Sequence, residues 1–311
     1  MDRVTTSTAY NSVIGNLMAA ENRQNQANLQ VSSGKVASDL KGFGSNAEAL
    51  TAAQTLKTRV DGYVQTAANA ASQLSAQDSA LTEVSTAGQS ARQAIAQAIA
   101  SGSASGLVAS MQSAFSQSVD GLNAQYNGVY LFSGGKVTTA PVAAQTLQDL
   151  TSPPAGGVFQ NDQLAASTKL NETTSVQTGM LASDIAGPLF DAFKQFETLD
   201  QSANGPLTGQ LTQAQQSALT GLLKTFDAAN AGVTETVAQN GLVQNQVETI
   251  QAGQQKRQTD LATTIGDMAN ADMGQASSQL AQAQTALQAS ARVFISLQST
   301  SLLNFLTGAG G

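Results

Sequence analysis

Small and apolar residues recur every seven positions through a long stretch of the first half of the chain. One line contains Val60, Ala67, Leu74, Leu81, Gly88 and Ile95, and a second line, three positions further on, contains Tyr63, Ala70, Gln77, Val84, Ala91 and Ala98. Two such lines are typical of the seam of a coiled-coil helix. They predict a helix over residues 47–100, roughly 80 Å long at 1.5 Å per residue, which must lie against other long helices.

The distribution of proline separates this helical region from the middle of the chain. All five prolines lie between residues 141 and 206, and proline costs about 3 kcal/mol in a helix interior. Apolar residues at spacings of three and four recur before residue 127 and again from Pro188 onwards. They predict helices over 107–126, from Pro188 onwards and over 211–228, and a long helical arm over 233–306.

Residues 136–187 differ from both flanks because they combine prolines with Val- and Thr-rich pieces, which favour a small, mainly β insert. Asn127-Gly128 is expected to end the preceding helix, and Val129–Phe132 is a strand candidate. The predicted fold class is mainly α, with a long antiparallel coiled-coil or bundle core from both chain ends and a small β-containing central insert. The predicted segments are an N-terminal assembly helix region (1–45), two halves of the core (46–135 and 188–268), the insert (136–187) and a C-terminal assembly helix region (269–311).

The two ends of the chain contain few large apolar side chains. Burial of apolar surface gains about 25 cal/mol per Å², whereas ordering the backbone costs about 1–2 kcal/mol per residue. We therefore expect residues 1–45 to be disordered in the isolated subunit. Both ends are expected to become helical only when they pack against neighbouring copies.

The composition removes several classes of function. The chain has no Cys, His or Trp, and 11% of its residues are charged, against about 25% in an average domain. A thiolate nucleophile, a Ser-His-Asp relay, a disulfide and ordinary zinc, copper or haem sites are therefore excluded. No catalytic residue, cofactor or metal is expected.

Carboxylates are the remaining candidates for chemistry, but their spacing does not support a site. Asp149, Asp162 and Glu172 are the acidic residues between positions 136 and 182. Asp267 and Asp272 are five positions apart on a predicted helix, which separates their side chains. We interpret this last pair as solvated or subunit-contact carboxylates.

Charge and hydropathy limit the partners. A net charge of −7 and an isoelectric point near 4.5 argue against nucleic acid. No run approaches the roughly 20 apolar residues of a membrane span, so no membrane insertion is expected. The first residues also lack the basic and apolar regions of a secretory signal.

Four stretches of the chain carry a resemblance to a known family. They are Leu29–Lys35, the helix through Tyr63 and Ala76–Val84, the tract Asn127–Gly134, and Ile265–Leu280 together with Ser301–Leu306. In their order and their distance from the termini they resemble the flagellin superfamily. The tract Asn127–Gly134 favours the hook-associated, hook–filament junction branch over flagellin itself.

This resemblance implies a structural, non-enzymatic protein of the bacterial flagellum, which joins the hook to the flagellin filament by coiled-coil assembly of its terminal helices. Its implied partners are further copies in a homo-oligomeric ring, flagellin, another hook-associated protein on the hook side and a flagellar export chaperone. It also implies an extracellular location, reached through type III export without a cleaved signal peptide.

Two sets of residues are candidates for function. The first set comprises assembly and partner contacts, namely Leu17, Leu29, Phe294, Leu297, Leu302, Leu303, Phe305 and Leu306. Within it, Phe294, Leu297, Leu302 and Phe305 are the candidate contacts to a chaperone. The second set is a core-to-insert tract, namely Asn127, Gly128, Tyr130, Phe132 and Gly134. This tract could be a strand that links helix and insert, or a contact with a neighbouring subunit.

Three other functions remain open at this point. A filament-forming flagellin differs from a junction protein in its abundance and in polymerising alone. A cytosolic helical scaffold or signalling protein would agree with the missing signal peptide. A carboxylate-based hydrolase in the insert is the third alternative.

Overall fold

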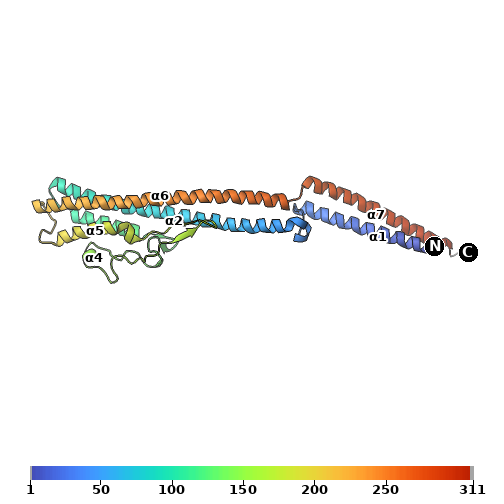
Figure 1. Cartoon of the computed structure of the whole chain (residues 1–311), viewed down its shortest axis with the longest axis horizontal. Helices are drawn as coiled ribbons and strands as arrows, with labels where there is room; N and C mark the ends of the chain where they lie inside the picture. Colours follow the sequence, from blue (N-terminus) through green and yellow to red (C-terminus); the bar gives the residue numbers. More distant parts are fainter. Residues whose placement is uncertain (1, 309–311) are drawn as a thin grey trace. The chain divides into compact units, whose positions relative to one another are not determined.

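The computed structural model describes the backbone of residues 2–308 and the side chains of residues 8, 10–296, 298 and 299. It is 72% helical, with long helices packed against each other and two small two-stranded sheets (Figure 1), which confirms the predicted fold class. The chain forms two compact units. Unit 1 combines Met1–Arg59 with Arg257–Gly311, and unit 2 is Val60–Lys256.

Unit 1 is built around two helices from opposite ends of the chain. Helix α1 (Asp2–Ser33) lies beside α7 (Met273–Gly308) and runs antiparallel to it (Figure 1). The buried residues between them are small, namely Ala20, Ala27, Ala276 and Ala283. Unit 1 also contains the 3-10 helix η1 (Leu40–Asn46) and the adjoining ends of two long helices, α2 (Ala47–Ser101) and α6 (Gln213–Ala269).

Unit 2 contains the main hydrophobic core. The remaining parts of α2 and α6 pack there against α3 (Leu107–Leu122) and α5 (Ala182–Gln201). The core centres on aromatic contacts, with ring centroids 5.1–5.5 Å apart, among Phe115, Phe190, Phe193 and Phe226. The predicted helix over 47–100 is confirmed, since its seven-residue lines are the buried face of α2.

The strands are short and form two antiparallel pairs. In the first pair, β1 (Gln125–Tyr126) is joined to β2 (Val129–Tyr130). In the second, β3 (Ser167–Lys169) pairs with β4 (Ser175–Gln177), and Thr168 lies opposite Val176. The insert also contains the short helix α4 (Gln148–Thr151). Leu170 and Val176 of the second hairpin pack on α2 and α6 in a cluster with Ala67, Ala70, Leu74 and Val247.

The predicted extension of the second helix to residue 126 is wrong. Helix α3 ends at Leu122, and Asn127-Gly128 forms the two-residue turn of the hairpin β1–β2. Both turn residues have positive φ, 51° and 79°, which a type I′ turn requires and which Asn-Gly adopts readily. The left-handed tendency of the dipeptide was therefore correctly identified, but it serves a hairpin rather than a helix end.

The predicted start of a helix at Pro188 is also wrong, because α5 begins at Ala182 and contains Pro188. Proline removes one backbone hydrogen bond, which leaves the carbonyl of Asp184 without its helical donor. Both Asp184 and Pro188 lie on the exposed face of the helix. Water can therefore solvate that carbonyl, and the helix continues.

The predicted arm over 233–306 and helix over 211–228 divide differently in the structure. Helix α6 runs without interruption through residues 228–233, because Ala229, Asn230 and Val233 are all buried there. The break comes instead at residues 270–272. The side chain of Asp272 accepts hydrogen bonds from the backbone N–H of Gly274 and Gln275, at 2.8 and 3.0 Å, and so caps the start of α7.

Candidate assembly surface

In unit 1, the segment that follows α1 is hydrogen-bonded to the segment that connects α6 to α7. The backbone N–H of Val36 donates to the carbonyl of Ala269, and that of Ala271 donates to the carbonyl of Gly34, each at 2.9 Å. The ammonium of Lys35 adds a 2.7 Å bond to the side-chain oxygen of Asn270. We call this arrangement the joint, defined as residues 34–36 and 269–271. It ties the end of α1 to the start of α7.

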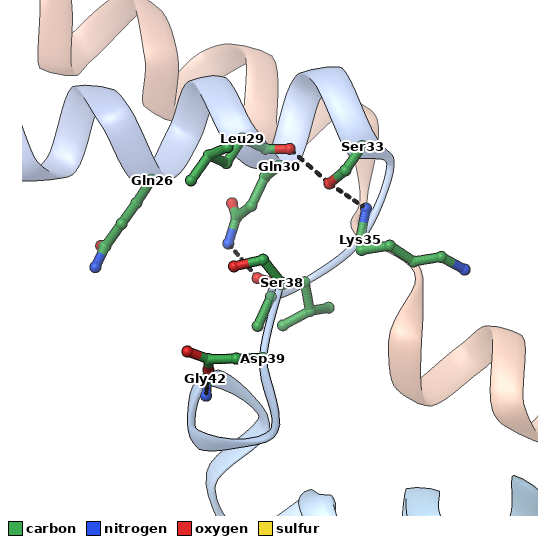
Figure 2. Close-up of a pocket in the computed structure, with 10 residues that line it drawn as sticks. Gln26, Leu29, Gln30, Ser33, Lys35, Ser38, Asp39 and Gly42 are labelled. Carbon is green, nitrogen blue, oxygen red and sulfur yellow. Dashed lines mark hydrogen bonds between the residues drawn. The ribbon is translucent and has the colours of Figure 1, made fainter.

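A cavity of about 280 Å³ lies beside the joint, between α1 and the chain that leads into η1 (Figure 2). Its walls are mostly uncharged. The side chain of Gln30 donates to the carbonyl of Val36 at 2.8 Å, and Asp39 accepts from the backbone N–H of Gly42 at 3.0 Å. Leu29 is 54% exposed, and the side chain of Lys35 extends away from the other labelled residues (Figure 2). The cavity thus offers an apolar and amide surface rather than a charged site.

Large apolar side chains are exposed mainly on unit 1. The most exposed on its helices are Ile295 (63%), Met18 (60%), Leu40 (56%), Leu29 (54%) and Val293 (50%). Tyr10, Val36, Leu56 and Met273 are also exposed there, whereas unit 2 exposes Val129, Val137, Leu164 and Leu242. Exposed apolar side chains on a helical pair are candidates for contact with another protein.

A groove of about 350 Å³ lies between α1 and α7. Its lining is small or uncharged apart from one arginine, and consists of Arg23, Gln26, Ala27, Gln30, Gln279, Gln282, Ala283 and Ala286. Glutamine amides both donate and accept hydrogen bonds. Such a groove can therefore receive another helix without requiring opposite charge.

The charges of the sequence divide unevenly between the units. Unit 1 contains eight Lys or Arg residues and seven Asp or Glu residues, whereas unit 2 contains six and fourteen. The acidic character of the chain therefore belongs to unit 2. Unit 1 is close to neutral, so burying its surface against identical copies brings little repulsion between like charges.

The structure places three of the predicted assembly residues. Leu17 is half-buried on α1, Leu29 is exposed beside the cavity, and Phe294 on α7 contacts Tyr10 with ring centroids 5.4 Å apart. The other predicted residues lie on α7, but their side chains are outside the described part of the chain, namely Leu297, Leu302, Leu303, Phe305 and Leu306. The pairing of Lys35 with Asn270 could not be predicted from the sequence, because a contact across 235 positions leaves no local signal.

The core-to-insert tract leads from the first hairpin into the core of unit 2. Asn127 and Gly128 are exposed at the turn, and Tyr130 is half-buried. Phe132 is fully buried, and its carbonyl accepts a hydrogen bond from the backbone N–H of Ala182 at 3.0 Å. The tract then reaches Gly134, which packs against the side chain of Asp162. Its central side chain thus contributes to the hydrophobic core.

The two aspartates of the insert that the sequence offered as acids hold backbone groups instead. Asp162 accepts from the backbone N–H of Gly135 and Leu164, both at 2.9 Å. These bonds, that from Gly135 foremost, lower the pKa of its carboxyl below the ordinary value. Asp149 accepts from the N–H groups of Gln145 and Thr146, both at 2.8 Å, which lower its pKa in the same way. Both carboxylates therefore stabilise turns.

Neither a metal site nor a membrane span is found in the described part of the chain. Among the side chains that the structure describes, no three His, Cys, Asp or Glu are placed to share a metal ion. No described helix combines the length and the apolar character needed to cross a bilayer.

The fold defines a class of proteins in which long helices from the first and last parts of the chain pack against each other, with a smaller insert between them in the sequence. Residues 4–137 match the family model for the bacterial flagellin N-terminal helical region, and residues 223–306 match that for the C-terminal helical region. The chain therefore belongs to the flagellin family.

Solved structures share this fold. One is a proposed flagellar hook-associated protein from Vibrio parahaemolyticus, with a TM-score of 0.60 and 19% identity over 75% of this chain and 99% of that one. Another is FlgL from Bacillus cereus, with a TM-score of 0.53 and 17% identity over 70% of this chain and 98% of that one. Among curated proteins, no significant match is found.

Proposed function

We propose that this flagellin-family chain is a hook-associated protein 3, the structural adaptor that joins the flagellar hook to the flagellin filament. The observation that carries the proposal is the exposed apolar surface of unit 1, formed by α1, α7 and the turn at the joint. An enzyme needs a site for chemistry, whereas this chain presents a near-neutral, apolar and amide-lined helical surface that suits assembly.

The names of two structural relatives favour a junction protein over a flagellin. One is a proposed flagellar hook-associated protein and the other is FlgL. At 17–19% identity these likenesses concern the fold, so the junction role rests on the surface of unit 1 and on the resemblance of the tract Asn127–Gly134.

The proposed partners follow from this role. Further copies of the chain would pack on α1 and α7 in a homo-oligomeric ring, with flagellin on one side and another hook-associated protein on the other. A flagellar export chaperone would hold α7 before export, through Phe294 and the predicted residues Leu297, Leu302 and Phe305. The protein would then act outside the cell, on the flagellum.

The experiment is a strain that lacks this protein, examined by electron microscopy. Hooks without filaments are the expected result, and the natural gene should restore the filaments. A gene carrying Leu29→Ser should restore far fewer, because this substitution removes an apolar contact from the exposed surface of unit 1. Leu242→Ser is the matched control, since Leu242 is 71% exposed on α6 in unit 2. Intact flagella in the deletion strain would contradict the proposal.

Two further measurements separate the alternatives. Purified protein that polymerises alone into long filaments would identify a filament-forming flagellin. Protein that stays inside cells with a working flagellar export system would favour a cytosolic scaffold. A junction protein should instead reach the medium through that system and remain unpolymerised alone.

A further inference from the structure

Buried polar side chains interrupt the contact face between α2 and α6. Along α6, residues at most 5% exposed recur every seven positions, namely Leu219, Phe226, Val233, Asn240, Val247 and Gln254. Within the described part of the chain, the buried side-chain N and O atoms without a hydrogen-bond partner belong to Gln77, Asn230, Asn240 and Gln254. All four residues lie on α2 or α6. Such atoms are costly in a helix interface and need an explanation.

Asn230 occupies space that only a glycine leaves open. It is 8% exposed, and both polar atoms of its side chain lack a partner. Its amide lies directly against Gly88 of α2. A Cβ atom at Gly88 would overlap the Oδ1 atom of Asn230, would lie 3.0 Å from its Cγ, and would lie 3.3 Å from the Cδ1 atom of Leu189 on α5. A Cβ atom at Gly88 would thus meet a side chain of α6 and a side chain of α5 at once.

Positions one heptad away on α2 cannot receive this amide. They are Leu81 and Ile95, both fully buried. Elsewhere the contact face of α2 is rich in alanine, and small side chains discriminate weakly between alignments that differ by seven residues. We propose that Asn230 and Gly88 form a register key, a complementary pair that admits one alignment of α6 against α2. A buried polar residue in a coiled coil often fixes register at a cost in stability.

Two other contacts agree with this alignment. The side chain of Asn240 donates to the carbonyl of Leu74 at 3.0 Å. Nearer the other end of the pairing, Arg92 forms an ion pair with Asp227. Both are consistent with the antiparallel alignment that places Gly88 opposite Asn230. The ion pair is half-exposed, so it discriminates weakly between alignments of α6 against α2. The register key is therefore the main determinant of the alignment.

The first test uses the sign of a glycine substitution. Gly88→Ala should lower the unfolding temperature by at least about 2 °C in the natural sequence, because the new Cβ atom displaces Asn230. In an Asn230→Ala background the same substitution should no longer lower it, because the overlap is gone and only the 3.3 Å approach to Leu189 opposes the higher helix propensity of alanine. Gly62→Ala is the control, since a Cβ atom there meets nothing within 4 Å. It should raise the temperature in both backgrounds.

The second test measures register directly. The chain has no cysteine, so Gln93→Cys on α2 and Gln246→Cys on α6 place two spin labels at exposed positions of unit 2. After refolding, the natural sequence should give one distance between the labels. Asn230→Ala should add a second population, displaced by about 10 Å, which is the rise of seven helical residues. Asn245→Ala, at an exposed asparagine on the same helix, should not.

Either of two results would overturn the key. One is a Gly88→Ala substitution that stabilises both backgrounds equally, as Gly62→Ala does. The other is a single, unchanged distance in refolded Asn230→Ala protein. Neither measurement depends on flagellar assembly, so the inference stands or falls independently of the proposed function.

Discussion

At the scale of the residue, Phe132 links the core-to-insert tract to the stability of unit 2. Its ring is fully buried, and its carbonyl is bonded to the start of α5. A buried phenylalanine truncated to alanine leaves a cavity in addition to the lost transfer free energy. The side chain therefore contributes to folding whether or not a neighbouring subunit contacts the tract.

Phe132→Ala is accordingly expected to reduce the free energy of unfolding by about 3–5 kcal/mol. Chemical denaturation of the purified subunit measures this loss. Val129→Ala is a suitable comparison, because Val129 is 38% exposed on the same hairpin and should change stability far less. An unaltered denaturation midpoint in Phe132→Ala, together with failed assembly, would instead assign the tract to a subunit contact.

Asp162 is expected to make the stability of the protein depend on pH. Because backbone donors hold its folded pKa below the ordinary value, its contribution is present above the unfolded pKa of about 3.9 and is lost as the pH falls through the folded pKa. The unfolding temperature of Asp162→Asn should therefore lie below that of the natural protein at pH 7, and the difference should shrink below about pH 4. Asp120→Asn, at an exposed site on α3, is the control and should leave the unfolding temperature at pH 7 nearly unchanged.

At the scale of the element, periodicity predicted helices well wherever one face of a helix is buried along its length. The bounds of α2 could be predicted because its two seven-residue lines face the core. The continuity of α6 could not, since Asn230-Ala231-Gly232 favours a break locally, whereas the burial of Ala229, Asn230 and Val233 in the folded core overrides that tendency. For the candidate site, the apolar residues of α1 and α7 were visible in the sequence. The joint was not, because it connects segments 235 positions apart.

The terminal helices α1 and α7 are expected to be only weakly protected from hydrogen exchange in the free subunit. Their shared seam consists of alanines and the Tyr10–Phe294 contact, which buries little apolar area against the entropy of two long helices. In the purified subunit, hydrogen exchange should therefore be fast over residues 5–35 and 280–305 and slow over 60–100. Assembly should slow exchange at both ends. Strong protection of both ends in the free subunit would contradict coupled folding and assembly.

At the scale of the whole molecule, charge is separated from the proposed contact surface. Unit 2 contains fourteen acidic and six basic residues, whereas unit 1 is nearly neutral. Copies brought together through unit 1 would still repel each other through unit 2. This repulsion is long-ranged at low salt and is screened beyond about 8 Å at 0.15 M.

Assembly is therefore expected to be favoured by moderate salt. Light scattering of the protein with its proposed hook-side partner should show more assembly at 0.15 M than at 0.01 M NaCl, where the screening length is about 30 Å. A variant with four acidic residues of α5 neutralised should lose much of this dependence, namely Asp184→Asn, Asp191→Asn, Glu197→Gln and Asp200→Asn. Assembly that weakens steadily as salt is added would indicate attraction between opposite charges instead.

The joint has a mechanical consequence. Val36 and Ala271 donate backbone hydrogen bonds between the segment after α1 and the segment before α7. A force or torque applied along α1 is therefore transmitted to the segment that leads into α7. Neither of these segments can extend alone while the two backbone hydrogen bonds and the Lys35–Asn270 contact remain intact. A rotating fibre that transmits torque through such hydrogen-bonded joints would distribute strain over paired polypeptide segments. The two segments of each joint would then give way together.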